Sequence, residues 1–209
     1  MKILILSPHT DDAELGCGGS IAKMIEEGHE LLWVVFSIAE DSLPHGLPKD
    51  TLKKEFLQVA NHLGLKERSY MICDFRVRHM DEKRQEILED LVKIRQSFQP
   101  DIVMMPSLND YHQDHQVISN ETIRAFKMHS SIIGYELPWN QLAFNTNLFI
   151  RLQKSHIDMK LDLLSHYKSQ LQLGRSYFSS EYVYGLAKVR GTQCNSSYAE
   201  AFEVVRWRI

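Results

Sequence analysis

Along the first 125 or so residues, short continuous apolar runs alternate with segments in which apolar residues recur at helical spacing. Continuous apolar runs, rich in β-branched residues and leucine, predict strands buried on both faces over residues 2–7, 30–37, 69–75 and 101–107. Apolar residues at helical spacing predict helices between and after these strands, over residues 19–28, 52–63, 87–98 and 116–126. Four successive strand–helix units predict a parallel sheet covered by helices on both faces.

The C-terminal part of the chain has a less regular pattern. It predicts strands over residues 131–139 and 148–153, a helix over 158–171 and a closing strand over 203–209. No internal repeat, low-complexity segment or linker interrupts the chain. We therefore expect one domain over residues 1–209, of the α/β class, with a Rossmann-like, mostly parallel sheet and a less regular C-terminal part.

Composition and charge narrow the function classes. The chain has 209 residues, 44% hydrophobic and 24% charged, with a formal net charge of -3 from interspersed charges. This pattern predicts a small-molecule ligand, and it argues against a nucleic-acid binder or a polybasic membrane binder. Three distant cysteines, the absence of a signal-peptide pattern and the lack of a long apolar run predict a soluble cytoplasmic protein without a membrane span. A homo-oligomer is compatible with the sequence.

The segment after the first predicted strand, SPHTDDAELGCGG, contains an acid and histidine cluster before its glycines. His9 and Asp12 can present an imidazole nitrogen and a carboxylate oxygen to one point, a ligand mixture that Zn2+ accepts. Asp11 is then left to take a proton from a metal-bound water. Either aspartate could instead cap the following helix. A dinucleotide site is disfavoured, because the glycines come about ten residues after the strand and the intervening carboxylates would repel phosphates.

A second cluster, NDYHQDHQ over residues 109–116, follows the fourth predicted strand. It contains His112, Asp114 and His115. The carboxyl ends of parallel strands lie at one edge of a sheet, so both clusters should meet there. Two interpretations without a metal are also open. Asp110 or Asp114 could cap the following helix, and the two histidines could be solvated in a polar loop. The two clusters together predict a metal site.

The paired motifs PHTDDAELGCGG and HQDH resemble the PIG-L/LmbE-like family of zinc-dependent deacetylases, which act on N-acetylated sugars and glycoconjugates. Later segments, including KLDLLSHYKSQ and YAEAFEV, occur in the order that the family shows. The resemblance implies a Zn2+ ion bound by His9, Asp12 and His115, and a partner that is a small N-acetylated sugar or glycoconjugate. The first motif departs from the family pattern at two positions, Thr10 and Ala13.

The resemblance also implies roles for the remaining residues of the two motifs. Asp11 would be the general base, and His112 would polarise the acetyl carbonyl and protonate the leaving amine. Asp114 would orient the His112 ring and raise its pKa.

Three residues after a predicted strand, Glu136, Trp139 and Asn140, are further candidates to line a sugar pocket. Two other functions fit parts of the pattern. A non-haem Fe(II) oxygenase uses two histidines and one carboxylate, and Fe2+ accepts the same ligands as zinc. The second alternative is a non-catalytic protein that has the same fold and binds a sugar or a metal without cleaving an amide.

Overall fold

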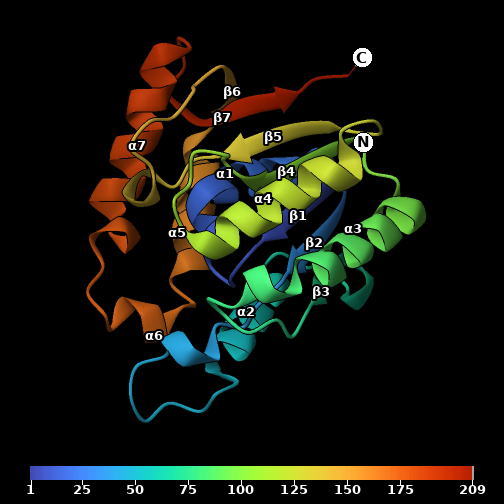
Figure 1. Cartoon of the computed structure of the whole chain (residues 1–209). Coiled ribbons are helices and arrows are strands. Elements are labelled where there is room, and N and C mark those ends of the chain that lie inside the picture. Colours follow the sequence, from blue (N-terminus) through green and yellow to red (C-terminus); the bar gives the residue numbers. More distant parts are fainter. Residues whose placement is uncertain (209) are drawn as a thin grey trace.

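A seven-stranded sheet forms the centre of the computed structural model, which describes residues 1–208. The strand order is β3-β2-β1-β4-β5-β7-β6 (Figure 1). β1 to β5 run parallel to one another, and β7 runs antiparallel to both β5 and β6. The strands are β1 Lys2–Ser7, β2 Glu30–Val35, β3 Tyr70–Ile72, β4 Ile102–Pro106, β5 Ser131–Tyr135, β6 Leu148–Leu152 and β7 Tyr198–Arg206. The predicted α/β class and mostly parallel sheet are confirmed.

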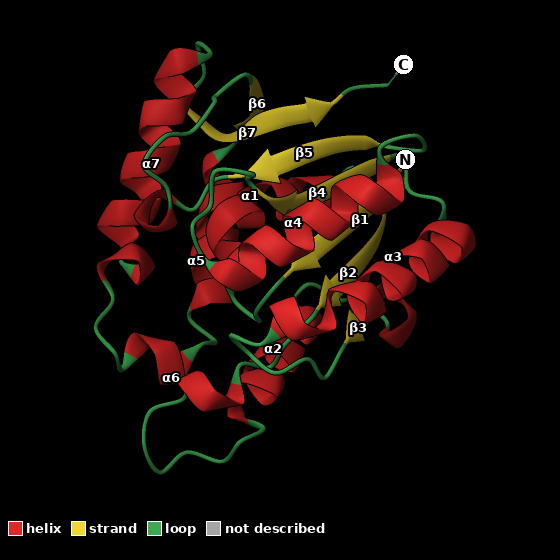
Figure 2. Ribbon diagram, in the orientation of Figure 1, coloured by secondary structure: helices red, strands yellow, loops and turns green. Residues whose placement is uncertain are grey.

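Helices cover both faces of this sheet (Figure 2). They are α1 Asp12–Glu26, α2 Thr51–His62, α3 Arg84–Phe98, α4 Gln113–Phe126, α5 Lys154–Leu164, α6 Lys168–Leu171 and α7 Ser180–Gln193. Alternate residues of β1 point to opposite faces. Ile3 and Ile5 belong to the core beneath α1, α2, α5 and α7, whereas Leu4 and Leu6 belong to the core beneath α3 and α4. Across residues 1–208, none of the helices is both long and apolar enough to cross a membrane.

The glycine run of the first motif lies inside α1 and not before it. The helix was predicted to begin near Gly19, but it begins at Asp12 and is kinked at Cys17, whose φ of -148° is not helical. The glycines allow close packing of this helix on the sheet. A Cβ added to Gly16 would lie 2.3 Å from a ring carbon of Tyr135, and one added to Gly19 would lie 2.7 Å from a methyl of Leu152.

The C-terminal elements also differ from the prediction. The helix expected over 158–171 is two helices, α5 and α6, and α7 was missed because its apolar residues do not form one stripe. β5 ends at Tyr135, and residues 138–140 form a short 3-10 turn instead of more strand. The closing strand, expected over 203–209, is β7, which begins and ends earlier; Ile209 lies outside the described residues.

A buried carboxylate stabilises the kink in α1. The kink frees the backbone N–H groups of Gly19 and Ser20, which donate to Glu200 of β7 at 3.1 and 2.7 Å. Lys160 of α5 donates to the same carboxylate at 2.7 Å. Lys160 and Glu200 are only 5% and 6% exposed. Helices α1 and α5 and strand β7 are therefore joined by one buried ion pair.

We expect Lys160→Met to destabilise the protein strongly, because it leaves the Glu200 charge buried without its partner. Urea denaturation should show a loss of about 3–5 kcal/mol in the free energy of unfolding. Lys154→Met is the matched control: Lys154 is exposed, and the loss of its ion pair with Asp158 should change stability by about 1 kcal/mol or less. An equal, small effect of both substitutions would contradict the role given to Lys160.

Candidate metal centre and active site

The two predicted clusters meet at the carboxyl edge of the sheet, beyond adjacent strands β1 and β4. His9 lies in the loop after β1, Asp12 is the first residue of α1, and His112 and His115 lie at the start of α4. β1 is also where the strand order reverses, between β2 and β4. Ligands of open parallel sheets bind at such positions. The location is therefore the one expected for a binding or catalytic site.

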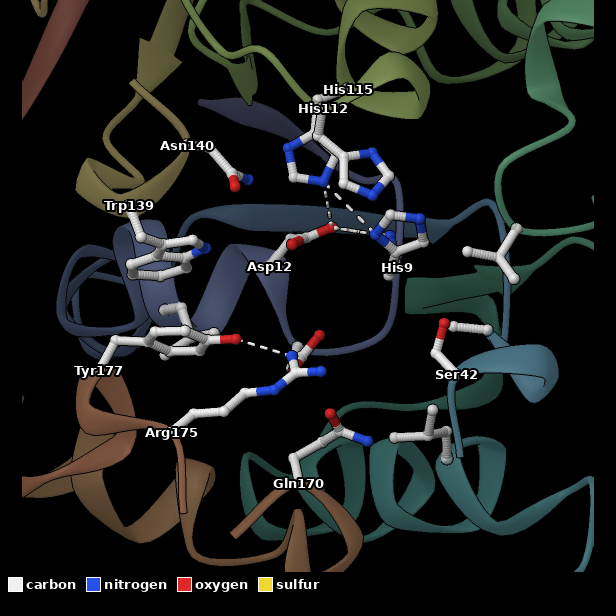
Figure 3. Close-up of a pocket in the computed structure, with 15 residues that line it drawn as sticks. His9, Asp12, Ser42, His112, His115, Trp139, Asn140, Gln170, Arg175 and Tyr177 are labelled. Atoms are coloured by element: carbon white, nitrogen blue, oxygen red, sulfur yellow. Dashed lines mark hydrogen bonds and ion pairs between the residues drawn. The ribbon is translucent and has the colours of Figure 1, made fainter. Parts of the chain in front are cut away.

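Three side-chain atoms converge on one point (Figure 3). The Asp12 Oδ2 atom lies 3.1 Å from His9 Nδ1 and 3.2 Å from His115 Nε2, and the two nitrogens are 3.4 Å apart. Zinc bonds of about 2.0–2.1 Å in a tetrahedron place neighbouring ligand atoms about 3.3 Å apart. These three side chains are therefore spaced as zinc ligands, and the fourth position is left for water or substrate.

His112 lies near this triangle but is a weaker ligand candidate. Its ring, with those of His9 and His115, offers nitrogens that lie within 4.8 Å of one another. However, its Nδ1 accepts a hydrogen bond from the Asp114 backbone N–H at 3.2 Å. The 3.1–3.4 Å spacing that includes Asp12 fits a single ion better than a wider set of three histidines.

A buried carboxylate contacts each of the two converging histidines, His9 and His115, on the side away from Asp12. Asp114 Oδ2 lies 2.9 Å from His9 Nε2, and Asp110 Oδ2 lies 2.8 Å from His115 Nδ1. Both aspartates are almost completely buried. Such contacts fix the tautomer and orientation of a metal-binding imidazole. Asp110 was considered only as a helix cap from the sequence, and its role as partner of His115 was missed.

Asp114 contacts the ring of His112, as predicted, but through its backbone N–H and not through its carboxylate. Its carboxylate contacts His9 and the backbone N–H of Arg78, at 2.9 and 2.7 Å, and not the ring of His112. His112 is the N-cap of α4, so its Nδ1 faces the free Asp114 N–H of the first turn. The backbone therefore orients His112, and Nε2 is left to carry the ring proton.

The Asp114 charge raises the pKa of His112, as predicted, but stronger effects outweigh it. Burial, and then the positive charges of His115 and His9, lower the pKa of His112 to about 4. In contrast, burial alone would lower the pKa of His9, but the Asp12 and Asp114 carboxylates raise it to about 9. His112 is therefore a neutral imidazole at neutral pH.

Asp11 has the environment of a general base. It lines the same cavity as the three converging side chains and is half-buried. In the described chain, its side chain does not cap α1, although it occupies the N-cap position. Burial, together with the nearby Asp12 charge, raises the pKa of Asp11 to about 6. The loop that holds Asp11 is fixed by Tyr167, whose hydroxyl donates to the Thr10 carbonyl at 2.5 Å.

The cavity in front of these residues has a volume of about 250 Å³. Trp139 and Asn140 line it, as predicted, but Glu136 is absent from its described lining because it forms a buried ion pair with Arg190. Residues that the sequence analysis did not single out also line the cavity: Ser42, Gln170, Arg175 and Tyr177. Gln170 lies in α6, and the other three lie in loops or short 3-10 turns; no metal-ligand pattern marks these segments, so spacing along the chain did not reveal them.

Two aromatic side chains form one wall of the cavity. The rings of Trp139 and Tyr177 are stacked, with centroids 3.9 Å apart and planes 11° apart (Figure 3). Arg175 donates to the Tyr177 hydroxyl at 2.7 Å. The wall joins the loop after β5 to the loop before α7, and it faces the metal centre across the cavity.

Comparisons with known proteins place the chain among deacetylases. The model of the PIG-L family, described as GlcNAc-PI de-N-acetylase, matches residues 4–126. Uncharacterized deacetylase YaiS of Escherichia coli K12 is 26% identical over 170 residues, which cover 80% of this chain and 90% of that protein.

Solved structures show the same fold at low identity. The N,N'-diacetylchitobiose deacetylase of Pyrococcus horikoshii has a TM-score of 0.81 and 21% identity, over 98% of this chain and 83% of that one. GalB of Pseudomonas putida KT2440, a 4-carboxy-2-hydroxymuconate hydratase, has a TM-score of 0.79 and 22% identity, over 100% and 97%.

We expect Asp110→Asn to weaken metal binding although Asp110 is not one of the three converging side chains. Loss of the carboxylate partner of His115 should reduce zinc affinity by about 10–100-fold, measured by competition with a chromogenic chelator. Asp81→Asn, at an exposed position, should leave the affinity unchanged. Equal zinc affinity of Asp110→Asn and the unsubstituted protein would show that this outer contact does not support the ligand.

Proposed function

The chain belongs to the PIG-L family of deacetylases, and from this premise we propose that it uses zinc to remove the acetyl group from the nitrogen of an N-acetylated sugar or sugar conjugate. The observation that supports the proposal most is the convergence of His9, Asp12 and His115 at 3.1–3.4 Å, with the carboxylate of Asp11 in the same cavity. A structural cation site would not need this additional base.

A zinc ion held by His9, Asp12 and His115 would lower the pKa of a bound water to about 7 and polarise the acetyl carbonyl. Asp11 would take the proton from the attacking water, because its carboxylate lines the same cavity as the three ligands and does not cap α1. The same carboxyl can then pass this proton to the departing nitrogen. Asp11 would thus act first as base and then as acid.

His112 would stabilise the negative charge that develops on the carbonyl oxygen. Because its Nδ1 accepts from the Asp114 N–H, the neutral ring carries its proton on Nε2 and can donate it to that oxygen. The sequence-based expectation that His112 also protonates the leaving amine does not fit its lowered pKa. We therefore assign that proton transfer to Asp11.

The cavity walls suit a sugar ring. The stacked Trp139 and Tyr177 offer a rigid apolar surface, and Asn140, Gln170 and Ser42 offer hydrogen-bonding groups for hydroxyls. We propose Trp139 and Asn140 as substrate-binding residues; Glu136 is paired with Arg190 and does not line this cavity.

We propose zinc as the metal in preference to Fe2+, because the spacing of the donor atoms suits a tetrahedral ion, although both metals accept these ligands. The chain would act as one deacetylase domain, because both motifs follow strands of a single sheet. A cytoplasmic location stays a prediction from the odd number and wide spacing of the cysteines.

The function is tested by measuring bound metal and acetate release from a panel of N-acetylated sugars and glycosides. For Asp11→Asn we expect retained zinc and acetate release lowered by at least about 100-fold, the effect of losing a general base. Asp81→Asn serves as the control for a lost surface carboxylate and should keep full activity. Near-normal turnover of Asp11→Asn would remove its assigned role, and a zinc-loaded protein that releases no acetate from the panel would contradict the proposed function.

A further inference from the structure

Arg78 has a backbone conformation that glycine adopts more readily than any other residue. It lies in a turn after β3, which is closed by a hydrogen bond from the His79 N–H to the Arg76 carbonyl at 3.2 Å. Its φ of 68° is in the left-handed region, which costs free energy for residues with a side chain. A residue stays in such a conformation only where its surroundings hold it there. The contacts of Arg78 therefore indicate what the strain serves.

The strained backbone directs one N–H group into the metal centre. The Arg78 N–H donates to Asp114 Oδ2 at 2.7 Å, and the same oxygen lies 2.9 Å from His9 Nε2. Asp114 is completely buried, and within residues 1–208 its other oxygen, Oδ1, has no hydrogen-bonding partner. A buried carboxylate is unfavourable unless it is hydrogen-bonded. The Arg78 N–H is therefore one of two groups in the described chain that stabilise this carboxylate, and the other is His9.

The side chain of Arg78 contacts a neighbouring loop instead of the metal centre. It is exposed, and its guanidinium donates to the Asp41 carbonyl at 3.3 Å. Arg76 donates to the Asp41 carboxylate at 2.9 Å, so both arginines connect the turn to the loop after β2. Exposed charged contacts of this kind contribute little free energy. The part of Arg78 that reaches the site is its backbone.

We propose that Arg78 is a positioning residue of the metal centre, and that it acts through its left-handed backbone and not through its charge. A change to the ordinary negative φ would turn the N–H away from Asp114. Asp114 would then keep His9 as its single partner, and the orientation of the His9 ring would no longer be fixed. The inference rests on the zinc site of the proposed function, but not on amide hydrolysis.

Substitutions that differ in their tolerance of a positive φ test the proposal. Valine is β-branched and strongly disfavoured in the left-handed region, whereas glycine adopts it freely. We expect Arg78→Val to lower zinc affinity by about 10–100-fold, measured by competition with a chromogenic chelator. Arg78→Gly, which also removes the guanidinium, should keep nearly the full affinity, and Arg78→Ala should lie between the two. The visible spectrum of bound Co2+, which reports ligand geometry, should change in Arg78→Val and not in Arg78→Gly.

Gln99→Val is the matched control. Gln99 also has a positive φ, 52°, but it follows α3 and precedes β4, at the opposite edge of the sheet from the metal centre. Both valine substitutions should lower the urea concentration at the midpoint of unfolding, because both strain the backbone. Only Arg78→Val should change the zinc affinity and the Co2+ spectrum. An equal loss of zinc affinity in the two valine variants would contradict a role at the metal centre.

Two further outcomes would overturn the inference. The first is normal zinc affinity of Arg78→Val, even in a protein that releases acetate from N-acetylated sugars. The second is an equal loss of affinity in Arg78→Gly and Arg78→Val, because the guanidinium and not the backbone would then be responsible. Conversely, zinc binding that Arg78→Val weakens and Arg78→Gly does not, in a protein that releases no acetate, would keep the inference and reject the deacetylase function.

Discussion

The site depends on two buried carboxylates, Asp110 and Asp114, each paired with one nitrogen of a histidine that faces Asp12. A buried charge is unfavourable unless it is paired and hydrogen-bonded, so these contacts restrict His115 and His9 to one orientation. The opposite ring nitrogens then meet Asp12 at 3.1 and 3.2 Å. Asp114 and His9 are 105 residues apart in sequence, and it is the parallel pairing of β1 with β4 that brings them together.

The fold by itself does not define the reaction. A protein named as a hydratase and a protein named as a chitobiose deacetylase share it at similar TM-scores. In this chain the distinguishing feature is the division of tasks among neighbouring acids. Asp12 faces the metal position, Asp114 supports a histidine, and Asp11 lines the cavity without capping α1. A carboxylate that remains available beside a metal position is suited to hydrolysis by an activated water.

Much of the fold and the meeting of the two motifs could be predicted from the sequence, because buried parallel strands give continuous apolar runs and both motifs follow such strands. Tertiary contacts decided the rest. The α1 kink depends on Glu200, which is 180 residues away from Ser20. The partner of Asp114 depends on how α4 lies against the β1 loop. Arg175 and Tyr177 reach the cavity from a loop before α7, a helix whose apolar residues form no single stripe.

The central claim is that His9, Asp12 and His115 bind one zinc ion while Asp11 and His112 remain free for chemistry. A crystal structure of the zinc-loaded protein, with anomalous diffraction recorded on both sides of the zinc absorption edge, tests it most directly. We predict one strong anomalous peak about 2.0–2.2 Å from His9 Nδ1, Asp12 Oδ2 and His115 Nε2. A peak bonded to the three histidines without Asp12, or coordinated by Asp11, would contradict the account.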